Sequence, residues 1–176
     1  CSNAGTGGPA AAIEDLSLDD WQGVLNSNLQ GAFLTCRWAA ARMKAQGKGC
    51  LILTSSTAGL FGYPLRTPYA TAKWGIIGLM KSLAIELGPS GIRVNAICPG
   101  SVEGDRMDRV VANEARARGV SEDEVRGSYV ANTSLRTWVS AQDIANMALF
   151  LASDAGAKIS GQAIAVDGNT ETKACR

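Results

Sequence analysis

The apolar residues of the chain alternate between short continuous runs and longer stripes at helical spacing. The stripes cover residues 18–45 and 69–87, and a shorter one ends near residue 152. The continuous runs are typical of strands that are buried on both faces, and they lie at residues 50–54, 92–98 and 162–166. This alternation predicts an α/β fold in which helices cover a parallel sheet.

Capping and turn residues mark where the helices begin and end. Thr67 is expected to cap the helix over 69–87, with Pro68 in its first turn, and the Gly-Pro-Ser-Gly sequence at 88–91 is expected to end it. Three serines each precede an acidic residue by three positions, which is the pattern of a capping box: Ser17, Ser121 and Ser140.

Tyr69 and Lys73 carry the main chemical signal of the sequence. They are four residues apart at the start of a helix, so their side chains share one face. A nearby ammonium favours a phenolate, which predicts a lowered pKa for Tyr69 and proton transfer near neutral pH. Ser56 follows the strand over 50–54 and precedes Tyr69 by thirteen residues. On its own, the Tyr-x-x-x-Lys spacing also fits an ordinary solvated helix start.

These residues belong to a longer series of motifs that resembles the short-chain dehydrogenase/reductase family in order and spacing. The series spans nearly the whole chain and consists of Ser2-Asn3-Ala4-Gly5, Asn28-Leu29-x-Gly31, Ser55-Ser56-x-Ala58-Gly59, Tyr69-x-x-x-Lys73, Pro99-Gly100 and Val166-Asp167-Gly168. The resemblance implies a doubly wound Rossmann-type α/β/α sandwich with a parallel sheet. No Gly-rich turn here stands between a first strand and a helix. We therefore expect residues 1–176 to be the catalytic half of one N-terminally truncated NAD(P)-binding domain.

The resemblance also implies a role for each site residue. Tyr69 would be the general acid or base, Ser56 would bind the same substrate oxygen, and Lys73 would assist Tyr69 and bind the nicotinamide ribose. Asn28 would hold a water in a proton relay, and Gly31 would admit a close backbone. The cofactor, NAD or NADP, would also contact Asn3, Ala4, Gly5, Pro99, Gly100 and Val102, with Asn3 tying its strand to the next.

One position departs from the family pattern, and the substrate pocket is less defined. Gly104 stands where the family often has a threonine that touches the cofactor, so that contact is missing or comes from another residue. Residues 101–137 combine mixed charges with helical segments, which is typical of a solvated face. Arg66 is either an anion-binding residue or a surface arginine. Candidate pocket residues are Tyr63, Leu65, Arg66, Met107 and Tyr129.

Three functions remain compatible with the sequence. The first is an NAD(P)-dependent oxidoreductase that interconverts a secondary alcohol and a ketone. The second is an epimerase or dehydratase that uses the same fold. The third is an inactive fragment or interaction module, and we expect the chain alone not to bind a dinucleotide productively. The family commonly forms homodimers or homotetramers, here through residues 18–45 and 69–87 with Trp38, Trp74 and Met80 as an apolar surface.

Composition narrows the choice further. Seventeen basic and sixteen acidic residues give no field for nucleic acid or an anionic membrane, and 46% apolar residues suit a globular enzyme. Histidine is absent, which excludes Ser-His-Asp catalysis, and no cluster of ligands suggests a metal. An odd number of scattered cysteines predicts free thiols and a cytoplasmic protein: Cys1, Cys36, Cys50, Cys98 and Cys175.

Overall fold

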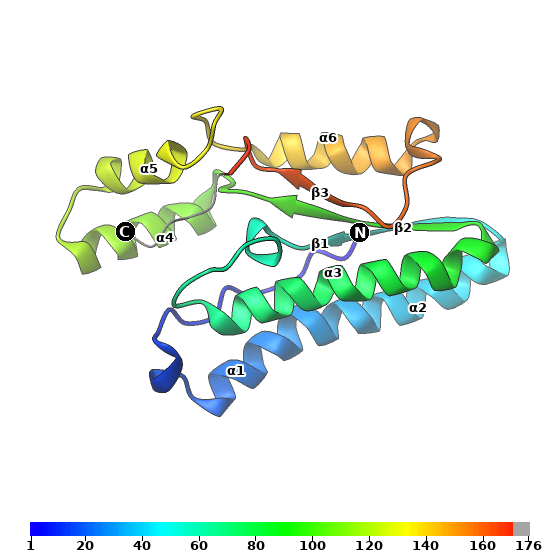
Figure 1. Ribbon diagram of the computed structural model, residues 1–176, viewed down its shortest axis with the longest axis horizontal. Helices are drawn as coiled ribbons and strands as arrows, with labels where there is room; N and C mark the ends of the chain where they lie inside the picture. The colour runs from blue at the N-terminus through cyan, green and yellow to red at the C-terminus, as the bar shows by residue number, and fades with distance from the viewer. Residues whose placement is uncertain (171–176) are drawn as a thin grey trace.

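The computed structural model describes residues 1–170 and contains a three-stranded parallel sheet with its second strand in the middle (Figure 1). Leu51 pairs with Val94 and Ala96 pairs with Ala163, so the register aligns the carboxyl ends of all three strands. Each strand lies close to its predicted bounds, and the parallel sheet is confirmed. The strands are β1 (Gly49–Thr54), β2 (Ile92–Pro99) and β3 (Ala163–Val166).

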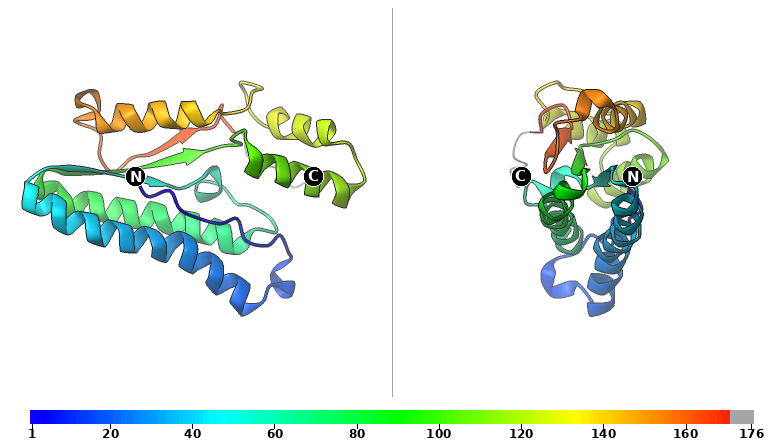
Figure 2. Two further views of the ribbon diagram at one scale, coloured as in Figure 1. Left: turned by 180° about the vertical axis from the view of Figure 1, so that it is seen from behind. Right: turned by 90° about the vertical axis from the view of Figure 1, so that its right-hand side faces the viewer.

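Helices cover both faces of this sheet (Figures 1 and 2). α2 and α3 pack on one face and α6 on the other, whereas α4 and α5 lie beyond the carboxyl end of β2. The three-layer Rossmann-type arrangement predicted from the sequence is therefore present. The helices are α1 (Leu18–Leu25), α2 (Gly31–Gln46), α3 (Thr67–Leu87), α4 (Asp105–Arg118), α5 (Glu122–Ala131) and α6 (Ala141–Ala152).

The core explains why β1 is apolar at consecutive positions. Leu51 and Leu53 face the cluster formed with α2 and α3, whereas Ile52 faces the cluster formed with α6. Successive side chains of a strand point to opposite faces, so a strand with helices on both sides needs apolar residues throughout. Met80 belongs to the first cluster and is fully buried, so the expectation that it forms part of an exposed surface is wrong.

The predicted helix over residues 18–45 is interrupted by a π turn, Asn26–Gln30, between α1 and α2. The Gly31 N–H donates to the Asn26 carbonyl five residues earlier, which is the π pattern. A Cβ on Gly31 would meet nothing closer than that carbonyl, at 3.7 Å. Among the described residues, no backbone therefore approaches Gly31 closely enough to require a glycine, and the prediction for this position is wrong.

Most predicted caps are present. Ser17, Ser121 and Ser140 each accept a hydrogen bond from the backbone N–H three residues later, and Ser140 completes a full capping box. The prediction for Thr67 is wrong, because Arg66 occupies the N-cap position and Thr67 is the first helical residue. α3 ends in a 3₁₀ turn, Gly88–Ser90, as the sequence predicts.

The first residues of the chain extend the sheet on the other side of β1. The Ser2 N–H donates to the Ile52 carbonyl at 2.8 Å, and the Thr54 N–H donates to the Ser2 carbonyl at 2.9 Å. The Ser2 backbone makes this junction, and the role implied for the Asn3 side chain stays a prediction. The backbone bonds nevertheless fix residues 3–5 beside the carboxyl end of β1.

The described cysteines are free thiols, as predicted, and Cys175 lies outside the described residues. Burial raises the pKa of the Cys36 thiol, and raises that of the Cys98 thiol to about 11, so both stay protonated at neutral pH. Across residues 1–170, no helix has the length and apolar character that crossing a membrane requires. The same residues hold no group of three or more potential metal ligands.

Gly59 allows the loop after β1 to press against α3, and this contact is testable. A Cβ on Gly59 would collide with Ser55 Oγ and would lie 2.8 Å from the Lys73 carbonyl oxygen, and the backbone there cannot yield. We therefore expect Gly59→Ala to lower the free energy of unfolding by about 1–3 kcal/mol, measured by urea denaturation. Gly62→Ala is the matched control, because a Cβ there meets nothing within 4 Å. Equal effects of the two changes would contradict this packing.

Candidate active site

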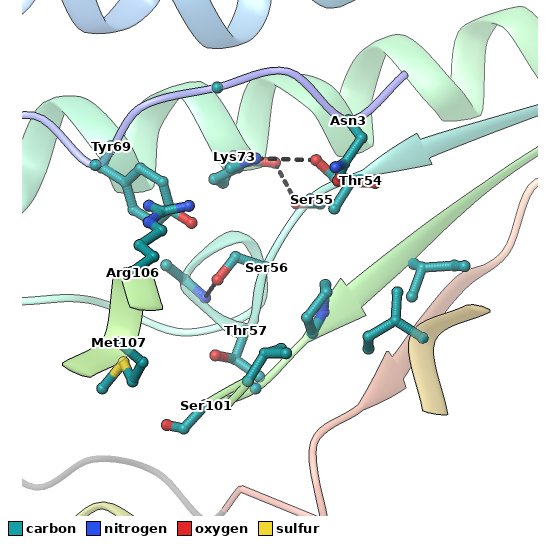
Figure 3. A pocket seen from close by; sticks show the side chains of 18 of the residues that line it. Asn3, Thr54, Ser55, Ser56, Thr57, Tyr69, Lys73, Ser101, Arg106 and Met107 are labelled. Carbon is teal, nitrogen blue, oxygen red and sulfur yellow. Dashed lines mark hydrogen bonds between the residues drawn. The ribbon is translucent and has the colours of Figure 1, made fainter. Parts of the chain in front are cut away.

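The residues singled out from the sequence surround one cavity at the carboxyl ends of β1 and β2. Its volume is about 1060 Å³, and open α/β sheets bind their ligands at this edge. Figure 3 shows several of the lining side chains, which come from the segment before α1, the end of β1, α3 and α4. The predicted site residues that line it are Asn3, Ala4, Gly5, Asn28, Ser56, Tyr69, Lys73, Pro99, Gly100 and Val102.

Lys73 locks the end of β1 to α3. Its side chain is only 5% exposed, and its Nζ donates to the Thr54 carbonyl at 2.9 Å. In the opposite direction, the Ser55 hydroxyl donates to the Lys73 carbonyl at 2.8 Å. Burial lowers the pKa of the Lys73 ammonium, with a smaller contribution from the positive charge of Arg106, and together they bring it to about 8. Two of the three ammonium protons remain for other acceptors.

Tyr69 lies one helical turn before Lys73, on the same face of α3. The Lys73 Nζ is 5.5 Å from the centroid of the Tyr69 ring, within the range of a cation–π contact. Tyr69 is half-buried, and its ring is directed into the cavity (Figure 3). The four-residue spacing therefore brings phenol and ammonium together, as the sequence predicts.

Ser56 leaves its hydroxyl proton available to a ligand. It follows β1 and caps a 3₁₀ turn, Thr57–Gly59, in which its Oγ accepts a hydrogen bond from the Ala58 N–H at 3.2 Å. A hydroxyl that accepts in this way keeps its own O–H for donation. The neighbouring Ser55 is buried and bonded to the Lys73 carbonyl, so the two adjacent serines have different environments.

Asn28 lies in the π turn and is only 1% exposed. Its Nδ2 donates to the Thr6 and Val24 carbonyls, both at 2.9 Å, while its buried Oδ1 has no hydrogen-bond partner among the described residues. A Cβ on Gly5 would collide with that Oδ1 and would lie 3.9 Å from the Lys73 Nζ. The unpaired acceptor and the ammonium therefore face the same small space, which suits a bound water or hydroxyl.

The end of β2 forms the opposite wall. Val102 pairs with Val139 through the Ser101 carbonyl and the Glu103 N–H. In a parallel pairing this arrangement turns the N–H and carbonyl of Val102 itself to the other side. Val102 lines the cavity, so these backbone groups are placed where a ligand can meet them.

The backbone at Gly104 accounts for its departure from the family pattern. Its φ of +132° and ψ of 174° belong to a region that is essentially restricted to glycine. A threonine at this position would strain the start of α4. The backbone conformation at this position therefore requires glycine, and a threonine could be placed here only if the backbone changed as well.

The cavity also includes residues that the sequence did not single out and omits one that it did. Tyr63, Arg66, Met107 and Tyr129 line it as predicted, whereas Leu65 does not, since its φ is +60° and its side chain is 56% exposed. The unexpected lining residues include two with charged side chains, Arg106 and Arg109 of α4. The mixed charges of residues 101–137 gave no signal for them, because the docking of α4 decides which of its faces meets the cavity.

The family of the chain follows from its match to known sequences. The profile of the family described as enoyl-(acyl carrier protein) reductase matches residues 1–169, which is nearly the whole chain. Together with the parallel sheet and the motif series, this match shows that the chain belongs to the short-chain dehydrogenase/reductase family.

Individual relatives agree with this assignment. The chain is 35% identical to D-beta-hydroxybutyrate dehydrogenase of Rhizobium meliloti over 157 residues, which cover 89% of this chain and 61% of the relative. Sorbitol-6-phosphate 2-dehydrogenase of Erwinia amylovora has a similar structure, with a TM-score of 0.89 and 34% identity over 94% of this chain and 65% of that chain. A xylitol dehydrogenase bound to NAD⁺ also gives a TM-score of 0.89, at 30% identity, over 96% of this chain and 66% of that chain. The chain thus spans about three fifths of the length of the relatives it matches.

The lowered pKa of Lys73 makes a prediction about stability. Between about pH 8 and its ordinary pKa of 10.5, the folded protein has released a proton that the unfolded chain still binds. The free energy of unfolding should therefore rise with pH over this window, by at most about 1.4 kcal/mol per pH unit. We expect this gain in the wild type relative to Lys73→Met, measured by urea unfolding from pH 7 to 10. Loss of the hydrogen bond to Thr54 lowers the free energy of unfolding of Lys73→Met by an amount that does not depend on pH. If the difference in free energy of unfolding between the two proteins does not change with pH, the burial of a charged ammonium is contradicted.

Proposed function

We propose that this chain forms the catalytic part of an NAD(P)-dependent oxidoreductase that interconverts a secondary alcohol and a ketone. The observation that carries the proposal is the convergence of Tyr69, Ser56 and the buried ammonium of Lys73 on one cavity. The relatives named above are dehydrogenases, and one of them binds NAD⁺, which supports the same class of reaction here.

Reduction of a ketone places negative charge on its oxygen, and the site must stabilise that charge and supply a proton. Tyr69 donates the proton, and Ser56 donates a hydrogen bond to the same oxygen with the O–H that its local cap leaves available. The ammonium of Lys73 stabilises the phenolate that remains on Tyr69. In the oxidation direction the phenolate removes the proton from the alcohol, so one set of groups serves both directions.

Asn28 and Lys73 provide a route by which the proton on Tyr69 is replaced. The Oδ1 of Asn28 is buried and unpaired among the described residues, and it faces the space beside Gly5 that the Lys73 ammonium also faces. A water held there accepts a hydrogen bond from the Lys73 ammonium and donates one to the Oδ1 of Asn28. After ketone reduction, Lys73 gives a proton to the Tyr69 phenolate, and this water, which is resupplied with protons from solvent, returns a proton to Lys73.

The cavity fits a nicotinamide cofactor, NAD or NADP. Gly5 and Gly100 leave space where a Cβ would meet Asn28 or Asp167, and two protons of the Lys73 ammonium have no acceptor in the described structure. Asn3, Ala4 and Gly5 would hold the ribose side with Lys73, and Pro99, Gly100 and the backbone of Val102 would hold the nicotinamide. When bound, the nicotinamide ring supplies or accepts the hydride.

We also propose that the protein self-associates through α2 and α3. Phe33 and Trp38 of α2 and Trp74 of α3 are 47%, 61% and 50% exposed, although side chains of this size are usually buried. A twofold axis that pairs these helices would cover all three residues. The solution mass of the full-length protein, measured by light scattering at micromolar concentration, tests this proposal.

Tyr69→Phe is the principal test of the mechanism. The change removes the proton carrier and keeps the ring, so we expect kcat to fall by at least about 10²-fold. The affinity for NADH or NADPH, measured by fluorescence titration, should change little. Product analysis of the wild type separates oxidation from epimerisation or dehydration, because only oxidation consumes the cofactor in proportion to the product. A Tyr69→Phe variant within tenfold of the wild-type rate would overturn the assignment.

The two adjacent serines provide a matched pair. Ser56→Ala removes a hydrogen bond to the reacting oxygen, so we expect kcat to fall about 10- to 100-fold, and it also removes the local cap to the Ala58 N–H, which costs about 1 kcal/mol of stability. Ser55→Ala removes the buried hydrogen bond that joins the end of β1 to α3, so we expect it to lower the free energy of unfolding by about 0.5–1.5 kcal/mol while the hydroxyl of Ser56 still serves the reaction. The comparison requires both steady-state rates and urea unfolding curves. A larger fall in kcat for Ser55→Ala than for Ser56→Ala would show that the two roles are reversed.

A further inference from the structure

The cavity carries a one-sided charge. Among the described residues, its lining includes four cationic side chains and no aspartate or glutamate. The whole chain has a formal charge of only +1, so this asymmetry is local. The four cationic residues are Arg66, Lys73, Arg106 and Arg109.

Three carboxylates near the cavity are bound elsewhere. Glu114 accepts a hydrogen bond from Tyr129 and pairs with Arg118, both at 2.9 Å. Asp108 pairs with Arg126, and Asp167 accepts from two backbone N–H groups of the segment that follows it. None of the four lining cations takes part in an ion pair within residues 1–170.

Arg66 and Arg106 converge on the backbone of Gly7. The Nη1 of Arg66 donates to the Gly7 and Gly8 carbonyls at 3.2 and 3.0 Å. This Nη1 and the Nη2 of Arg106 each lie 3.2 Å from the position that a Cβ on Gly7 would occupy. The two nitrogens are therefore no farther apart than twice that distance. Two guanidinium groups this close repel each other unless an anion lies between them.

The pair of arginines lies near the reacting groups. Arg66 precedes Tyr69 by three residues at the start of α3. Arg106 extends from the start of α4 toward Tyr69 and Lys73 (Figure 3), and its charge is close enough to contribute to the lowered pKa of Lys73. An anion bound between the arginines would therefore share the cavity with a hydroxyl or carbonyl held by Tyr69.

We propose that Arg66 and Arg106 form a subsite for an anionic group of the substrate, so that the protein acts on secondary alcohols or ketones that carry a carboxylate or a phosphate. This inference rests on the proposed function. Guanidinium groups bind both anions through paired N–H donors, which gives orientation as well as affinity. Arg109 follows Arg106 by one helical turn and adds a third charge on the same side of the cavity.

Matched substrates test the proposal in the full-length protein. Straight-chain hydroxy acids with the hydroxyl at carbon 2, 3 or 4 are compared with their methyl esters, and a hexitol 6-phosphate is compared with the hexitol. We expect the wild type to prefer the charged member of one pair by at least tenfold in kcat/KM. Arg66→Met and Arg106→Met should each remove about tenfold or more of this preference, mainly through KM, and should change the neutral member less than about threefold. Lys158→Met, at an exposed site outside the cavity and outside α2 and α3, is the control and should keep the preference.

Two further measurements separate the outcomes. The affinities of both variants for NADH and NADPH should match those of the wild type. If a variant loses cofactor affinity as strongly as it loses the preference for charged substrates, the arginines bind a cofactor phosphate, and the proposal is overturned. The melting temperature with 10 mM hydroxy acid or its ester does not depend on turnover. If the acid raises the melting temperature more than the ester does, and Arg106→Met loses this difference, the subsite is supported. This holds even if no oxidation occurs, because the absence of oxidation would contradict only the proposed function. Equal shifts with acid and ester across the series would overturn the subsite.

Discussion

The burial of the Lys73 ammonium is the constraint on which the rest of the site depends. A charged group that leaves water must recover hydrogen bonds, and the Thr54 carbonyl supplies one at 2.9 Å. The Ser55 hydroxyl then binds the Lys73 carbonyl, and Gly59 allows the loop to approach α3 closely enough for both contacts. The end of β1 is thereby held at a fixed distance from α3. Tyr69, one turn earlier on the helix, takes its position from the same contacts.

The site is also marked by polar groups that the fold does not satisfy. The buried Oδ1 of Asn28 has no partner among the described residues, and an unpaired buried acceptor costs about 1–3 kcal/mol. The π turn that carries Asn28 forgoes regular α-helical bonding in the middle of a long helix. Lys73 retains unused donors close to this acceptor. A chain selected for stability alone would have removed these costs, so their occurrence in one cavity is better explained by a ligand.

The sequence predicts the regular helices and strands well. It does not predict the places where a single residue rotates the helical stripe or turns the backbone. Apolar runs located all three strands, and the Tyr69–Lys73 spacing placed both side chains on one face of α3. The π turn was missed because the apolar residues on each side of it keep helical spacing, so two stripes of different phase were taken as one. Leu65 was assigned to the pocket by its apolar side chain, but its positive φ turns it outward, and no local pattern predicts such a conformation.

The charge of the cavity illustrates the same limit at a larger scale. A balanced composition correctly indicates a weak overall field, yet it says nothing about which side chains meet in space. On α4, Arg106, Arg109 and Val110 follow the spacing of one helix face and line the cavity, while Asp108 faces α5 and pairs with Arg126. The docking of α4 therefore places Arg106 and Arg109 on the side that faces the cavity, and leaves on the other side charged residues that are paired with each other or with α5. Because that docking depends on contacts with α5 and with Trp138, the chemistry of the pocket is a tertiary property of the chain.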